Sequence, residues 1–301
     1  MSASVTLSIG TNTAIAAAKG FGWFVTGSPT LFAETIHSIA DVANQVLLKI
    51  GEVRGKMPAN RKHPFGHGQE KYFWALVSAV SVFFVGCGLN LYHGIHALIQ
   101  RAPVEPFTPL VLGLLLFALV LESFTLVVAL REIGGWKGVV ANRHNTTVLA
   151  VVLEDAVALL GIALTLVVAG VSFVWGPRPA FDAAVAIAVG ALLGAMALFL
   201  ASINRRLLID ISDVDLDRPV QRYLAEQGVT AEASSVVVDD DHAVVFLRAV
   251  PGSARPFDTA DSYALGEALK AQLLATTGKT IDEVYWKFPL APAPAGTTSA
   301  R

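Results

Sequence analysis

His37 and Asp41 stand four residues apart in a mostly apolar segment, and both side chains are common ligands of divalent metals. In a helix, residues i and i+4 share one face with Cβ atoms about 5–6 Å apart, so both can bind one ion. Asn44 lies one turn later, where it can hold a ligand in its orientation. Glu34 lies one turn earlier and either orients His37 or marks the outer end of the segment. The stretch therefore predicts half of a metal site.

Glu154 and Asp155 are adjacent in a second apolar stretch, VLAVVLEDAVALLGIAL, which contains no basic residue. Carboxylates are costly in a hydrocarbon environment and usually mark an ion or proton path. A divalent cation between the two segments would offset this cost. Imidazole nitrogen with carboxylate oxygens suits zinc, whereas a set richer in oxygen favours manganese or magnesium. Binding needs neutral histidine and ionised aspartate, so protons compete with the metal and its movement can be coupled to theirs.

The composition indicates which elements position these residues. Of 301 residues, 54% are hydrophobic and only 15% are charged, which is too apolar for an ordinary soluble domain and predicts an integral membrane protein. A bilayer core takes about 20 apolar residues as helix. Six such stretches are predicted as transmembrane helices, at 9–28, 31–52, 72–99, 108–130, 146–174 and 181–203.

Lysine and arginine are unevenly distributed between the connections. They gather after the second, fourth and sixth stretches, at Arg54, Lys56, Arg61, Lys62, Lys71, Arg131, Lys137, Arg143, Arg205 and Arg206. Because basic loops stay in the cytoplasm, both termini are expected to be cytoplasmic. The chain begins without a basic amphipathic presequence, which favours a bacterial cytoplasmic membrane.

The last third of the chain is polar and predicts a small soluble domain. Its patterns predict a helix, two strands around the acidic turn DDDH, a second helix, and a final strand at IDEVYWKF. The order αββαβ suits a small sheet covered by two helices. The expected organisation is therefore a six-helix transmembrane domain at 1–206, a cytoplasmic αββαβ domain at 207–290, and a disordered tail at 291–301 that is rich in Pro, Ala, Ser and Thr.

Structural explanations compete with the metal site. A single histidine within a membrane can simply hydrogen-bond neighbouring helices, but an aspartate one turn away and an acidic pair on another helix favour an ion site. Glu122 in the fourth stretch is ambiguous in the same way as Glu34: it either supports a ligand or simply lies near the membrane interface. Lys19 in the first stretch is expected either to pair with an acidic residue or to extend to the membrane interface.

Several longer motifs together resemble a known family. The segments TGSPTLFAETIHSIADVANQVLLKIG and HPFGHGQEKYFWAL, an aspartate in the fifth span and the αββαβ tail are similar to the cation diffusion facilitators, which are divalent-metal/proton antiporters. The segments FFVGCGLNLYHGI and VVLEDAVALLG are most similar to the zinc transporter 9-like branch. The resemblance implies a homodimer in the bilayer, with the tail domain serving dimerisation.

The resemblance also implies ligands, one residue at a time. The zinc members carry His-x-x-x-Asp on the second and on the fifth span. His37 and Asp41 match the first pair and Asp155 matches the second aspartate, but Val151 replaces the second histidine. Glu154 is about 100° away around an ideal helix, so it is either a fourth ligand or a proton carrier, and water is the alternative fourth ligand.

A further site in the family lies in the loop between spans two and three, as Asp-x-x-His-x-x-x-His. His63 and His67 match it, but Asn60 replaces the aspartate, so metal should bind there weakly or not at all. A purely structural role for this loop is an equal alternative to metal binding, because Pro64, Gly66 and Gly68 would shape the loop as a turn.

The sequence as a whole predicts a Zn²⁺/H⁺ antiporter that exports zinc from the cytoplasm and needs no cofactor. It has no nucleotide-binding glycine loop, and no Ser, Cys or HExxH arrangement that indicates an enzyme; no nucleic-acid partner is expected. One alternative is a transporter of Mn²⁺, Fe²⁺ or Co²⁺, because the site is biased toward oxygen. The other is a metal-sensing membrane scaffold that does not transport.

Overall fold

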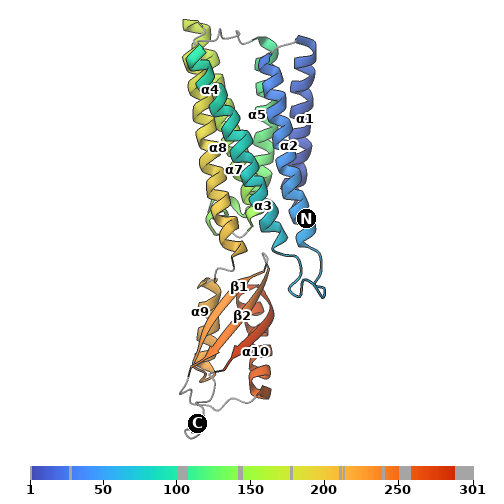
Figure 1. Ribbon diagram of the computed structural model, residues 1–301, viewed down its shortest axis with the longest axis vertical. Coiled ribbons are helices and arrows are strands. Elements are labelled where there is room, and N and C mark those ends of the chain that lie inside the picture. The colour runs from blue at the N-terminus through green and yellow to red at the C-terminus, as the bar shows by residue number, and fades with distance from the viewer. Residues whose placement is uncertain are drawn as a thin grey trace, which may run out of the picture. The chain divides into compact units, whose positions relative to one another are not determined.

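A computed structural model of the chain describes residues 2–26, 29–100, 108–141, 145–176, 179–209, 212, 214–238, 241–250 and 259–288. The chain divides into two compact units, residues 1–208 and 209–301 (Figure 1). The first is a bundle of helices, and the second combines two helices with a three-stranded sheet. The expected disordered tail at 291–301 lies outside the described residues.

The first unit consists mainly of long helices near the predicted positions. They are α1 (Ala3–Thr26), α2 (Pro29–Gly55), a continuous helix formed by α3 (Glu70–Ser81), the π-helical η1 (Val82–Cys87) and α4 (Gly88–Gln100), α5 (Pro109–Ile133), α7 (Thr146–Trp175) and α8 (Pro179–Leu208), with the short α6 (Gly135–Ala141) between α5 and α7. Within the described residues, four stretches are long and apolar enough to cross a membrane: Glu70–Gln100, Pro109–Ile133, Thr146–Trp175 and Ala183–Leu208. A helix is present at each of the six predicted positions, and α1 and α2 are similar in length to the other helices. Among the described residues, however, only the four stretches above are apolar enough to be identified as spans from composition.

Local sequence signals fix the ends of α5 and α7. Thr108 precedes α5 and its hydroxyl accepts a hydrogen bond from the Val111 N–H at 3.3 Å, with Pro109 at the first helical position. Gly134 ends α5 with a φ of 92°, a left-handed conformation that glycine adopts readily. Asn145 caps α7 by accepting from the Val148 N–H at 3.3 Å. The helices that carry Glu122, Glu154 and Asp155 therefore begin at defined residues.

Glycines let the helix α3–η1–α4 approach α8 closely, and Figure 1 shows α4 and α8 side by side. A Cβ atom built on Gly94 would lie 2.6 Å from the Ile187 side chain and 2.9 Å from the Ala183 carbonyl oxygen. On the α8 side, a Cβ on Gly194 would lie 2.9 Å from Sγ of Cys87. This pair of helices is thus held at a distance that side chains at these positions would prevent.

The buried apolar core of the bundle lies toward one of its ends. Its members come from the first turns of α1 and α7, from α3 and η1, and from the C-terminal halves of α2, α5 and α8, and include Val5, Leu48, Ala75, Ile133, Val148 to Val152 and Leu200. At the opposite end, large apolar side chains are exposed, among them Phe24, Ile99 and Phe173. Exposed apolar side chains also occur near the first end, such as Phe73 and Trp136, as expected for helices whose outer faces contact lipid.

The second unit confirms the predicted αββαβ order. It comprises α9 (Val214–Glu226), β1 (Ala231–Val237), β2 (His242–Ala249), α10 (Thr259–Thr277) and β3 (Thr280–Lys287). Strand β2 lies between β1, to which it is antiparallel, and β3, to which it is parallel.

Both helices of this unit pack on the same face of the sheet. Leu216 and Leu224 of α9 and Leu269 and Leu273 of α10 form one core with alternate strand residues such as Val245. Residues of the opposite parity lie on the other face, where Phe246 and Tyr285 stack with ring centroids 5.4 Å apart. These two rings are 43% and 44% exposed, so this face is not covered by the helices of the unit.

Candidate intramembrane metal site

Helices α2 and α7 carry the described residues of the predicted site, and α5 packs beside α7. Helix α2 packs against α7, and α7 packs against α5. Asp41 lies on α2 and is half-buried, and Asp155 lies on α7 and is 1% exposed. The backbone of His37 and Glu34 belongs to α2, but their side chains lie outside the described part of the structure.

The Glu154 carboxylate faces α2 through hydrogen bonds. The Asn44 amide donates to both of its oxygens, at 3.1 and 3.2 Å, and the Gln45 amide donates to Oε2. Asn44 in turn accepts a 2.6 Å bond from the hydroxyl of Ser78 on α3. All four side chains are buried, so neutral donors satisfy this carboxylate within an apolar environment.

The neighbouring Asp155 faces a different helix. It interacts with the side chains of Glu122 and Thr125, both on α5, and electrostatically with Asp41. The Glu122 side chain is hydrogen-bonded to Asp155 and interacts electrostatically with Asp41 and with Lys19 of α1. Of the two roles expected for Lys19, this interaction agrees with the first, an association with an acidic residue, and the acidic residue is Glu122. Successive helical residues point about 100° apart, which explains why the two adjacent acids have separate partners.

Asp155 also has an unsatisfied acceptor. Its Oδ2 is buried and has no hydrogen-bond partner among the described residues, an arrangement that normally costs about 1–3 kcal/mol and requires an explanation. Among the described side chains, no three His, Cys, Asp or Glu groups are close enough to bind one metal ion. The acidic groups of α2, α5 and α7 would therefore have to move closer together to share a cation.

The predicted loop site forms a hydrogen-bonded turn. The rings of His63 and His67 lie with centroids 4.0 Å apart. Oδ1 of Asn60 accepts from the N–H groups of Lys62 and His63, so its amide nitrogen faces Nε2 of His67 at 3.2 Å. Nε2 then acts as an acceptor, and Nδ1–H donates to Glu70 at 3.2 Å. Both ring nitrogens of His67 thus have protein partners, which supports the structural explanation; metal binding here stays a prediction.

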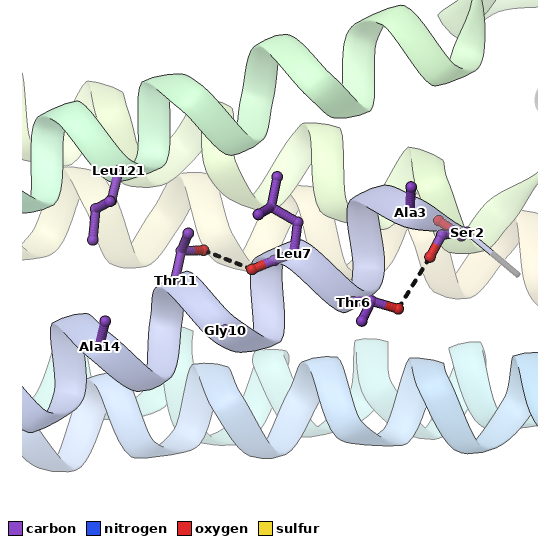
Figure 2. Close-up of a pocket in the computed structure, with 8 residues that line it drawn as sticks. All are labelled: Ser2, Ala3, Thr6, Leu7, Gly10, Thr11, Ala14 and Leu121. Atoms are coloured by element: carbon purple, nitrogen blue, oxygen red, sulfur yellow. Dashed lines mark hydrogen bonds between the residues drawn. The ribbon is translucent and has the colours of Figure 1, made fainter.

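A groove between α1 and α5 does not belong to the site. It has a volume of about 670 Å³ and is lined by the residues drawn in Figure 2, namely Ser2, Ala3, Thr6, Leu7, Gly10, Thr11, Ala14 and Leu121. The Thr6 hydroxyl donates to the carbonyl oxygen of Ser2, just before α1, and the Thr11 hydroxyl donates to that of Leu7 within α1. None of the eight residues is charged, so the groove offers no strong ligand for a cation.

The sequence did not indicate two residues of this region, Ser78 and Thr125, and it assigned no definite role to a third, Glu122. Ser78 and Thr125 carry ordinary hydroxyls in apolar helices, and neither has a spacing that would single it out. Glu122 was ambiguous because it follows no motif, although a lone carboxylate in an apolar span was itself a signal. Its contact with Asp155 depends on how α5 packs on α7, which only the structure reveals.

Helices long and apolar enough to cross a bilayer, with carboxylates buried between them, define an integral membrane protein. Residues 5–209 match the family described as the cation efflux transmembrane domain. The chain belongs to this family, the cation diffusion facilitators.

Individual relatives agree with the family. The "proton-coupled zinc antiporter SLC30A9, mitochondrial" of Xenopus laevis is 35% identical over 199 residues, 64% of this chain and 35% of that protein. The human protein of the same name is 32% identical over 200 residues, with the same coverage. Metal tolerance protein C4 of Arabidopsis thaliana is 30% identical over 241 residues, 75% of this chain and 51% of the relative. This chain therefore matches about a third to a half of the length of these relatives. The mitochondrial names give no support to the expected bacterial origin.

Proposed function

We propose that this protein exchanges a divalent metal, Zn²⁺ first, for protons across a membrane. Asp155 carries the proposal, because it is a buried carboxylate in an apolar helix, beside other carboxylates, with an oxygen that lacks a partner among the described residues. A divalent cation would satisfy that oxygen and offset the negative charge. The names of the relatives, which include zinc antiporters and a metal tolerance protein, support the same reading.

His37, Asp41 and Asp155 are the proposed ligands of the transported ion. One imidazole nitrogen and two carboxylates suit zinc, and each must lose its proton to bind. Protonation therefore releases the metal, and loss of the protons permits loading, which couples the two ions without a cofactor. The basic connections place both termini in the cytoplasm, so we expect export from that side when the opposite side is the more acidic.

The test is metal flux into proteoliposomes with an imposed pH gradient. We expect Zn²⁺ uptake that depends on the gradient and ceases when an ionophore dissipates it. Competition by Mn²⁺, Fe²⁺ and Co²⁺ separates zinc transport from the alternative of another metal. Tight metal binding without flux, from protein shown to be folded, would contradict transport and favour a metal-sensing scaffold.

We also propose that the protein acts as a homodimer whose contact includes the uncovered face of the C-terminal sheet. Phe246 and Tyr285 form an exposed aromatic pair there, with Arg248 and Glu232 paired at 3.5 Å nearby. Exposed aromatic patches with a polar rim are typical of association surfaces. Light scattering in detergent should give the mass of two chains, and replacing Phe246 with aspartate should shift the population toward one. An unchanged mass for this variant would contradict the role of this face.

A further inference from the structure

The site as proposed has three ligands, whereas zinc in proteins usually binds four groups. The fourth position implied by the family resemblance is occupied by Val151, which is fully buried and has no donor atom. We propose that Glu122 of α5 supplies the fourth ligand to the transported cation, together with His37, Asp41 and Asp155. This inference rests on the proposed function, and it adds a third helix to the site.

The position of Glu122 supports this role. Glu122 and Thr125 are three residues apart and therefore share one face of α5, and both interact with Asp155 of α7. The Glu122 carboxyl group also lies close enough to Asp41 of α2 to interact with it electrostatically. Glu154 interacts electrostatically with the same two aspartates, but Glu122 does so from α5, a helix outside the family motif.

The competing candidate, Glu154, is already satisfied. Both of its oxygens accept hydrogen bonds from Asn44, and one also accepts from Gln45. To bind the ion it would have to break these buried bonds and leave two buried amides without an acceptor, which is unfavourable. Glu122 is hydrogen-bonded to Asp155, a proposed ligand of the same ion, and interacts electrostatically with Lys19.

A separate observation concerns an unsatisfied acceptor between these acidic groups. Oδ2 of Asp155 is buried and has no hydrogen-bond partner within the described residues, although the carboxyl groups of Glu122 and Asp41 lie close by. A divalent ion between these groups would give the oxygen a partner and reduce the repulsion among the carboxylates.

This ligand set has a consequence for the substrate. Three carboxylates and one imidazole form an oxygen-rich site. Such a site favours Mn²⁺ over Zn²⁺ more than a site with two imidazoles and two carboxylates does. The expected substrates are therefore first-row divalent cations. The difference in affinity between Zn²⁺ and Mn²⁺ should be smaller than in a site with two His-x-x-x-Asp pairs.

The experiment compares metal binding to purified full-length protein in detergent. Calorimetric titration with Zn²⁺ should show binding to Glu122→Gln that is weaker by at least about tenfold, the scale seen when groups around a metal are removed. Glu132→Gln is the matched control, because Glu132 lies on the same helix and accepts from the Ser4 N–H at 2.8 Å, away from the site; its affinity should equal that of the wild type. Glu154→Gln tests the competing ligand and should change affinity less than Glu122→Gln.

A second measurement separates ligation from a structural role. The visible absorption spectrum of bound Co²⁺ reports its donor atoms, so Glu122→Gln should shift the spectrum as well as weaken binding. Weaker binding with an unchanged spectrum would overturn the proposal, as would wild-type affinity in Glu122→Gln while Glu154→Gln or Asp155→Asn loses it. If Asp155→Asn also binds with wild-type affinity, the proposed function itself fails.

Discussion

Replacing Asp155 with asparagine should reduce proton-driven zinc flux by about 100-fold or more. Asparagine preserves the shape of the side chain, but its amide is a poor metal ligand and carries no proton to exchange. Loss of groups that surround metal sites already costs about 10–100-fold, and a direct ligand is expected to lie at or beyond the upper end of that range. The measurement is initial Zn²⁺ uptake by proteoliposomes that contain equal amounts of folded protein.

The matched control is Asp282→Asn, which changes the same type of residue in the C-terminal unit. Asp282 accepts a 2.7 Å hydrogen bond from Nδ1 of His242, and an asparagine oxygen can still accept it. Flux in this variant should be close to that of the wild type. Wild-type flux in Asp155→Asn would contradict the proposed role of Asp155 as the central ligand of the site.

The second large effect concerns stability rather than transport. Gly94→Leu should destabilise the bundle by about 3 kcal/mol or more, at or above the upper end of the usual overpacking cost. Even the first atom of the new side chain would lie 2.6 Å from Ile187 and 2.9 Å from a backbone carbonyl oxygen of α8, so α4 and α8 must separate. Thermal unfolding in detergent, followed by size-exclusion chromatography, measures the loss.

Gly113→Leu is the control for this prediction. Gly113 lies on α5, and a Cβ atom built there meets nothing within 4 Å, so the larger side chain has room. Its unfolding temperature should match that of the wild type or exceed it, because leucine favours helix over glycine. Equal losses in both variants would show that the close contact at Gly94 is not what stabilises this helix pair.

The architecture could be predicted from the sequence because each element depends on local signals. Apolar length indicated the helices, and Thr108, Asn145 and Gly134 fixed the ends of α5 and α7. The αββαβ order followed from alternation in the strands and spacing in the helices. The π-helical turn at Val82–Cys87 could not be predicted, since nothing in VFFVGC distinguishes it from an ordinary helix.

The site could be predicted only in part, and the reason is the relative rotation of the helices. Spacing placed His37 and Asp41 on one face of α2, and adjacency placed Glu154 beside Asp155. It could not show that Glu154 faces amides on α2 while Asp155 faces Glu122 on α5. Those contacts depend on packing between segments more than 30 residues apart, for which a single sequence contains no signal.

The buried apolar core of the bundle has a thermodynamic consequence for transport by alternating access. The core that includes Val5, Leu48 and Val148 to Val152 surrounds the first turns of α7, at the end that we place in the cytoplasm. Opening that end to load an ion from the cytoplasm would expose these apolar side chains to water, and such exposure raises the heat capacity. The equilibrium between the two access states would then change non-linearly with temperature, and the rate of ion exchange would follow a curved rather than a straight Arrhenius plot.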